Sequence, residues 1–189
     1  MFRLLSKLIL VLAGWKVIGK EYKDIKRCIV VMAPHTSNWD FVLGRLGYAS
    51  LGMEVHFLMK KESFKFPLGY LIKVIGGIPV DRKHSTNVIS IITDMFRTKE
   101  HLILTITPEA TRSLNHNWKR GFYYIALQSD IPLLLGYLDF SKKEAGLGCV
   151  VIPTGNYEQD MVKIEAFYKT KTALYPEKFN LSPVNRQKN

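Results

Sequence analysis

Cysteine is scarce in this 189-residue chain, which contains two. Cys28 and Cys149 each lie within an apolar, strand-like run, and no Cys-x-x-Cys pair occurs. The sequence therefore excludes a disulfide framework and a cysteine-based metal site. Neither thiol has a histidine or carboxylate beside it to act as a base, so we expect two buried small hydrophobes in a protein of a reducing compartment.

Acidic residues are also few. The chain has 16 Asp and Glu against 27 Lys and Arg, a net charge of +11. Such an excess favours an anionic partner: a phosphate group, a membrane surface, nucleic acid or an acidic protein. Nucleic acid is disfavoured because the basic residues are dispersed and no base-stacking aromatic motif occurs, so we expect no nucleic acid partner.

An apolar run long enough to span a bilayer, roughly 20 residues, is missing as well. The stretch from Met1 to Val17 is strongly apolar, but its uncharged part, Leu8 to Trp15, is much shorter. No small-x-small cleavage site of a signal peptide follows it. Seven basic and two acidic side chains lie in the first 27 residues. We expect residues 1–20 to form an amphipathic helix in the membrane interface, and the alternative is a first helix packed on the domain.

No internal repeat or linker is present, so we expect one domain. The predicted division is residues 1–20 as the membrane-interface helix, 21–175 as the main domain and 176–189 as an irregular tail. Periodicity and capping residues predict strands and helices in alternation. The strands are expected at 28–32, 54–59, 77–80, 101–106, 132–140 and 148–152, and the helices at 39–50, 67–74, 86–98, 119–128 and 156–169. This order predicts an α/β fold: a single domain with a mostly parallel mixed sheet, helices on both faces and one antiparallel hairpin near the end.

One short motif stands out at the end of the first long strand. His35 is followed five residues later by Asp40, and Ser37 or Asn38 between them is a good helix N-cap. The histidine is then expected in the loop at the carboxyl end of a strand, where α/β sheets bind ligands. The aspartate in the first helical turn can accept from one imidazole nitrogen, which fixes the tautomer and raises the basicity of the other. The motif predicts a general base, although this spacing alone also arises by chance.

Three further segments fall at expected strand ends, namely Gly76–Arg82, Thr107–Ser113 and Ile131–Leu135. With the His-x4-Asp motif they form four blocks over residues 28–140, in an order that resembles the lysophospholipid acyltransferase family, which includes glycerol-3-phosphate and 1-acylglycerol-3-phosphate acyltransferases. The sequence Lys119-Arg120-Gly121-Phe122 also matches a basic-Gly-aromatic step before the last block. Ala110 departs from the family, which usually has glycine there, so the backbone approach to a phosphate is expected to differ.

The resemblance implies an O-acyltransferase and a role for each matched residue. His35 would be the base and Asp40 the residue that orients it. Arg82 would hold the acceptor phosphate, and the remaining substrate-binding positions would be Glu109, Thr111, Arg112 and Lys119. An arginine suits the phosphate because its planar fork binds bidentately.

The reaction expected from the resemblance moves a fatty acyl group from acyl-CoA or acyl-carrier protein to a lysophospholipid or glycerol-phosphate hydroxyl. No serine or cysteine in the blocks is placed as a nucleophile, which favours direct transfer without an acyl-enzyme. We expect no cofactor and no metal. The expected location is peripheral, on the cytoplasmic face of the inner (plasma) membrane.

Each assignment has a simpler alternative. His35 could cap the helix, Asp40 could serve only the helix dipole, Arg82 could be a solvated charge, and Glu109 could pair with Arg112 across their loop. At the level of function, the alternatives are a non-catalytic module that binds anionic lipid and a hydrolase in which His35 activates water against a thioester or ester.

Overall fold

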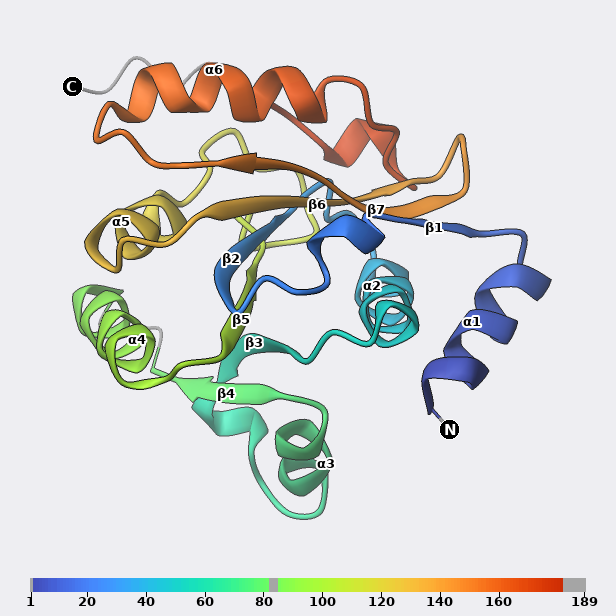
Figure 1. Ribbon diagram of the computed structural model, residues 1–189, viewed down its shortest axis with the longest axis horizontal. Coiled ribbons are helices and arrows are strands. Elements are labelled where there is room, and N and C mark those ends of the chain that lie inside the picture. The colour runs from blue at the N-terminus through green and yellow to red at the C-terminus, as the bar shows by residue number, and fades with distance from the viewer. Residues whose placement is uncertain (1, 82–84, 182–189) are drawn as a thin grey trace.

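A single sheet organises the molecule. The computed structural model describes residues 2–81 and 85–181, without the side chains of residues 85–87. Within these residues the sheet has seven strands in the order β1-β7-β6-β2-β5-β3-β4, parallel except between β6 and β7. Helices lie on both of its faces (Figure 1). This confirms the predicted α/β class with a mostly parallel mixed sheet and an N-terminal helix.

The predicted elements occur close to their expected positions. The strands are β1 Lys16–Ile18, β2 Arg27–Met32, β3 Val55–Lys60, β4 Gly77–Val80, β5 Leu102–Ile106, β6 Leu133–Asp139 and β7 Glu144–Val151. The helices are α1 Phe2–Leu12, α2 Asn38–Leu51, α3 Leu68–Val74, α4 Ser85–Thr98, α5 Gly121–Gln128 and α6 Tyr157–Tyr168. Asn156 caps α6 by accepting from the Gln159 amide, as the sequence predicts.

The parallel strands determine which loops meet. β2 lies in the middle of the sheet between β5 and β6, and its β-branched residues are buried on both faces. Because β2, β5, β3 and β4 run in parallel, the loops after them emerge at one edge of the sheet. That edge carries the His-x4-Asp motif, the block that starts at Thr107 and the carboxyl end of β4.

The fourth block lies elsewhere. Leu133 pairs with Ile29 near the amino end of β2, so Ile131–Leu135 enters the sheet at the edge opposite His35. Its leucines are buried in the core. The segment was expected at a strand end, and it forms the amino end of β6, whereas the other segments include residues that follow a strand.

The N-terminal region also differs from its prediction. The first helix, expected over residues 1–20, ends at Leu12, because Gly14 adopts φ +77° and turns the chain. The next residues form β1, which pairs in parallel with β7 and was not predicted. β7 itself begins at Glu144, earlier than expected. Among the described residues, the helices are too short or too polar for any of them to cross a membrane.

Candidate active site

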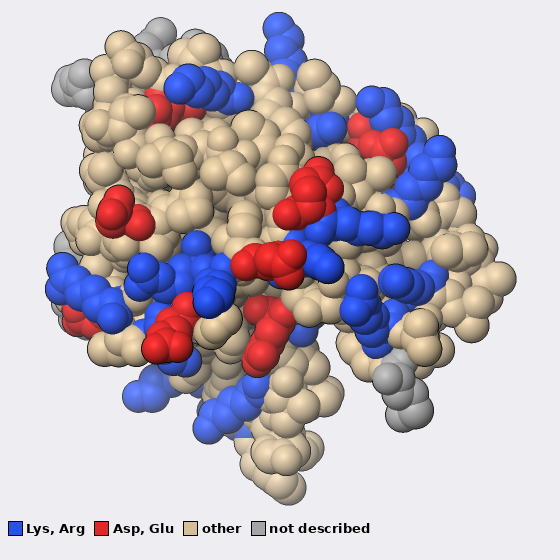
Figure 2. Space-filling view, in the orientation of Figure 1, with Lys and Arg blue, Asp and Glu red and all other residues tan. Residues whose placement is uncertain are grey.

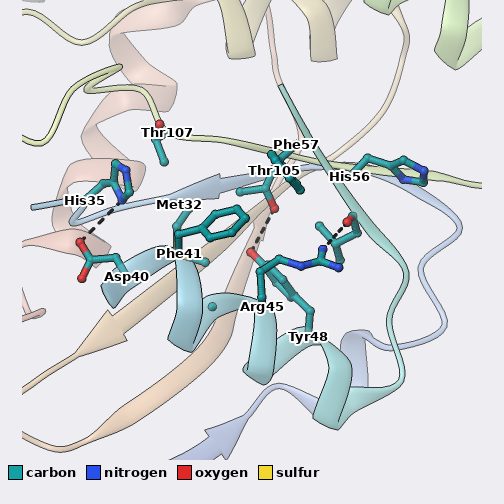
Figure 3. Close-up of a pocket in the computed structure, with 12 residues that line it drawn as sticks. Met32, His35, Asp40, Phe41, Arg45, Tyr48, His56, Phe57, Thr105 and Thr107 are labelled. Atoms are coloured by element: carbon teal, nitrogen blue, oxygen red, sulfur yellow. Dashed lines mark hydrogen bonds and ion pairs between the residues drawn. The ribbon is translucent and has the colours of Figure 1, made fainter. Parts of the chain in front are cut away.

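His35 lies in the loop that follows β2, at the mouth of a cavity (Figure 3). Its side chain is 17% exposed, and its Nδ1 is 3.6 Å from Asp40 Oδ2. This distance is longer than a hydrogen bond, as is common for catalytic pairs in proteins without substrate. The geometry directs Nδ1 toward the carboxylate and leaves Nε2 for a substrate.

Asp40 is held by the first turn of α2. Ser37 is the N-cap and Asp40 the third helical residue, and together they form a capping box. Asp40 Oδ2 accepts from the amides of Thr36 at 2.6 Å and Ser37 at 2.8 Å. These two bonds fix the carboxylate beside His35, so one residue both starts the helix and orients the imidazole. Burial raises the pKa of Asp40, while the two amides oppose that rise.

The pKa of His35 moves opposite to the effect expected of Asp40. Burial, with a smaller contribution from the positive charge of Arg112, lowers this pKa to about 4. The imidazole is therefore neutral near pH 7. A neutral imidazole is the form that can accept a proton, so the shift keeps His35 in the state that a general base requires.

Support for the loop comes from the far end of the chain. The Tyr168 hydroxyl, at the end of α6, donates to the carbonyl of Val31 and lies 3.1 Å from that of Gly136. These carbonyls belong to the neighbouring strands β2 and β6. Thr36 Oγ1 also accepts from the Tyr175 amide at 3.3 Å. Residues from the C-terminal part of the chain thus hold both sides of His35.

Glu109 is a buried acid beside this pair. It follows β5, and neither of its carboxyl oxygens has a hydrogen-bond partner within the described part of the chain. Burial raises the pKa of Glu109 to about 8, the negative charge of Asp40 adds to the rise, and the backbone amide of His35 opposes it. The carboxyl group is therefore mostly protonated at pH 7.

The rest of this loop reaches toward α2. Arg112 Nη1 donates to Asn38 Oδ1 in the first turn of the helix, so Arg112 is not paired with Glu109 in the described structure. The Thr111 hydroxyl accepts from the Ser113 amide at 3.2 Å, and Lys119 is exposed. Ala110 has φ +57°, a left-handed conformation that favours glycine, which accounts for the glycine usual in the family.

Arg82 lies outside the described residues. The strand before it, β4, ends at the same edge of the sheet as β2 and β5. No metal-type cluster of three or more His, Cys, Asp or Glu occurs in residues 2–81 and 85–181.

The cavity below His35 brings in residues that the sequence did not single out. It has a volume of about 50 Å³, is partly open to solvent, and lies between α2, β3 and β5. Figure 3 shows Phe41, Arg45 and Tyr48 along one side of α2. Tyr48 Oη lies 3.2 Å from Thr105 Oγ1, and Arg45 donates to the Val55 carbonyl. The helical spacing of residues 41, 45 and 48 was the available signal, but it is also typical of a core helix.

Comparisons with known proteins agree with this arrangement. Residues 14–139 match the family model described as "Acyltransferase". A 1-acyl-sn-glycerol-3-phosphate acyltransferase of Limnanthes douglasii is 30% identical over 127 residues, and its counterpart in Limnanthes alba is 29% identical. Each match covers 63% of this chain and 43% of the relative, so the alignment spans less than half the length of these curated relatives.

A solved structure shares the fold. The crystal structure of the 1-acyl-sn-glycerophosphate (LPA) acyltransferase PlsC from Thermotoga maritima has a TM-score of 0.56 and 19% sequence identity. The superposition covers 86% of this chain and 73% of that one. Since the family model takes in most of the chain, including the His-x4-Asp motif, the protein belongs to the acyltransferase family.

Proposed function

We propose that the protein transfers a fatty acyl group from a thioester to the hydroxyl of a phosphate-bearing, glycerolipid-type acceptor. The observation that carries the proposal is a neutral His35, oriented by Asp40, at the mouth of a largely apolar cavity. A simple helix cap does not need a histidine there, because Ser37 and Asp40 already form the cap. A lipid-binding module without catalysis likewise has no use for an oriented base.

His35 acts as general base in the proposed mechanism. Nε2 takes the proton of the acceptor hydroxyl as its oxygen forms a bond to the thioester carbonyl carbon. The tetrahedral intermediate then collapses, the carbon–sulfur bond breaks, and the leaving thiolate takes the proton from the imidazolium. Asp40 stabilises the imidazolium between the two steps. No acyl-enzyme forms. One positioned base of this kind contributes about 10²–10⁴-fold to the rate.

The cavity is the proposed site of the acyl chain. Its lining is mostly apolar and includes Met32, Phe41, Val55 and Phe57. The cavity volume is about 50 Å³, far below the roughly 300–1,000 Å³ of pockets that enclose a whole small molecule, so the cavity receives only the part of the chain next to the thioester. A chain that enters beside His35 places its thioester carbonyl next to Nε2.

The acceptor phosphate is assigned to the loop after β5 and to Arg82. Arg112 lies close enough to lower the pKa of His35, so a phosphate bound by it is also near the base. The protonated carboxyl of Glu109 adds no negative charge and does not repel an anionic acceptor. Thr111 and Lys119 are further proposed contacts of this acceptor. The proposed donor is acyl-CoA or acyl-carrier protein.

The proposed place of work is a membrane surface. The apolar side chains that α1 exposes are Phe2, Leu4, Leu5, Leu8, Ile9, Val11 and Leu12. Leu10 on the other side packs with Trp15 and Leu138, so the helix is attached to the domain and also offers an apolar face. The two free cysteines suit a reducing compartment, which favours the cytoplasmic face of the inner (plasma) membrane.

An assay of the pure protein tests this function. Thiol release from acyl-CoA, or from acyl-carrier protein, is measured with and without lysophosphatidate, and the lipid product is identified by mass. We expect release that depends on the acceptor and a product heavier by one acyl group. Release at the same rate without acceptor identifies a hydrolase. No release from either donor, with vesicle binding intact, identifies a lipid-binding module. Mass spectrometry of the protein during turnover should detect no covalent acyl adduct.

A further inference from the structure

A second amphipathic segment, residues 60–74, projects from the edge of the sheet beside β4. It contains α3 and appears as the lowest part of the molecule in Figures 1 and 2. The large apolar side chains that it exposes are Phe66, Leu68, Tyr70, Leu71 and Val74. Phe66 is 94% exposed and Tyr70 74%. Single exposed apolar residues are ordinary, but this many within nine positions mark an interaction surface.

The segment is firmly attached on its other side. Gly69 and Ile72 of α3 are buried. A Cβ at Gly69 would lie 2.2 Å from the Phe64 carbonyl oxygen, and a Cβ at Gly77 would lie 2.4 Å from Ile72 Cγ2. These contacts pack α3 against its own loop and β4 without space between them. The direction in which Phe66 and Tyr70 point is therefore set by packing of the opposite face.

The charges around the apolar residues identify the partner. Exposed lysines flank them at positions 60, 61, 65 and 73, and Glu62 is the one acid among residues 60–74, so the segment carries +3. Figure 2 shows basic side chains above a tip of uncharged residues. An apolar, partly aromatic tip with lysines behind it fits the interface of an anionic bilayer, where ammonium groups reach the headgroups and rings enter the acyl boundary.

The position of the segment relative to the site points to the same partner. Residues 61–66 follow β3, so they leave the sheet at the edge that also carries His35. In Figure 1 α3 is the lowest part of the molecule and α1 lies at its right, with the N-terminal end of α1 as the end nearer to α3. We propose that residues 60–74 form a second lipid-contacting element that docks on an anionic membrane surface together with α1. This rests on the proposed function for the choice of a bilayer as the surface.

Vesicle sedimentation of the full chain tests the proposal. The vesicles consist of phosphatidylcholine, with or without phosphatidylserine. The variant Phe66→Ser/Tyr70→Ser/Leu71→Ser should bind at least about tenfold more weakly, since it removes three large apolar groups from the contact. A matched control, Val150→Ser/Ile152→Ser/Val162→Ser, removes three exposed apolar side chains of β7, α6 and the loop between them and should bind like wild type. Lys65→Glu/Lys73→Glu should lose only the extra binding that phosphatidylserine provides.

Amide hydrogen exchange gives a second readout that needs no substitution. Exchange of residues 64–74 in the wild-type protein should slow when phosphatidylserine vesicles are added. The triple variant Phe66→Ser/Tyr70→Ser/Leu71→Ser is called the α3 variant below. Equal loss of vesicle binding in the α3 variant and the control variant overturns the proposal, as does unchanged amide exchange of residues 64–74. Unchanged vesicle binding of the α3 variant, with a wild-type dimer in lipid-free ultracentrifugation that the variant loses, overturns it in favour of a second copy of the chain.

The membrane docking of residues 60–74 and the proposed acyl transfer are tested by independent experiments. Vesicle binding is measured without acyl donor, so an inactive protein still shows whether α3 contacts lipid. Conversely, the α3 variant should retain full activity toward a short-chain, water-soluble acceptor, because none of its changed residues lies in the site. Loss of that activity overturns a purely lipid-contacting role of α3.

Discussion

The two faces of the sheet are built differently. The face covered by α4, α5 and α6 is filled with large buried side chains, among them Phe96, Phe122 and Tyr123. Among the described residues, the face covered by α1 and α2 has fewer buried side chains, and Gly44 and Gly47 on α2 leave space above the strands. The first face therefore provides most of the close packing, while the second keeps an open cavity that ends at His35. Stability and the proposed chemistry are concentrated on opposite sides of the same strands.

The largest expected effect concerns the open side. His35→Ala should lower kcat by about 10²–10⁴-fold and leave the free energy of unfolding almost unchanged, because the side chain is at a cavity mouth and contributes little packing. Asp40→Asn should also lose most activity. Steady-state kinetics and urea unfolding measure the two quantities. His101→Ala, at an exposed histidine, is the control, and near wild-type turnover of His35→Ala would remove the catalytic assignment.

The next effect belongs to the packed side. Phe96→Ala should reduce the free energy of unfolding by about 3–5 kcal/mol, because it leaves a cavity in a filled core. Activity per folded molecule should persist. Phe41→Ala should reduce the free energy of unfolding by clearly less, because the Phe41 ring is partly exposed on the face covered by α1 and α2. Equal losses in urea unfolding would show that the two faces do not differ in the way described.

Filling the cavity tests the open side directly. A Cβ at Gly44 meets no atom closer than Met32 Cε at 3.8 Å, so Gly44→Leu should be tolerated while its side chain occupies the space. We expect kcat/KM for a long acyl donor to fall about tenfold relative to a short one, roughly the value of two buried methylenes. Gly47→Ala, which adds a methyl near Ala145, should leave the chain-length profile unchanged. An unaltered profile in Gly44→Leu would place the acyl chain elsewhere.

A smaller effect is expected in the loop after β5, where Ala110 is held at φ +57°. Ala110→Gly should raise the free energy of unfolding by about 1–2 kcal/mol, because the left-handed conformation is unfavourable for a residue with a Cβ. Ala49→Gly, within α2, should lower the free energy of unfolding by about 0.5–1 kcal/mol. Thermal unfolding of the two variants measures both stability changes. A loss of stability in Ala110→Gly would show that the backbone at this position is not strained.

The smallest expected effect is a pH dependence that arises from Glu109 in the same loop. The pKa of Glu109 is raised to about 8, so its carboxyl group ionises as the pH rises through that value. The new negative charge should raise the KM of an anionic acceptor several-fold. The free energy of unfolding should fall between about pH 4.5 and pH 8, because over that range the folded state keeps a proton that the unfolded state has lost. Glu109→Gln should remove both the rise in KM near pH 8 and the fall in stability below it. The imidazole of His35, with a pKa of about 4, should add no change to this KM between pH 6 and 8.

The sequence predicted what depends on local spacing. A histidine before an N-cap and an aspartate at the third helical position are brought together by the geometry of one helical turn, and the structure places them so. The alternation of β-branched runs with capped helices likewise led to the α/β class. Both predictions rest on contacts between residues that are close in the chain.

What was missed depends on contacts between distant residues. β1 has three residues and exists because it pairs with β7, more than 120 positions away. The cavity joins side chains of α2, β3 and β5, none of which is unusual in its own segment. The lowered pKa of His35 follows from burial and from Arg112, and neither is visible in the spacing to Asp40.

The hydrogen bonds of Tyr168 have a consequence for the order in which the protein becomes active during synthesis. The proposed catalytic and substrate-binding residues are complete once Lys119 has been made, yet the Val31 carbonyl beneath His35 is still without its phenolic donor and Gly136 has not been made. That donor is the last residue of α6, which must leave the ribosome and dock before the loop is supported. A nascent chain that stops short of α6 should therefore contain every proposed catalytic and substrate-binding residue and remain inactive, so that the proposed acyl transfer begins only with the finished fold.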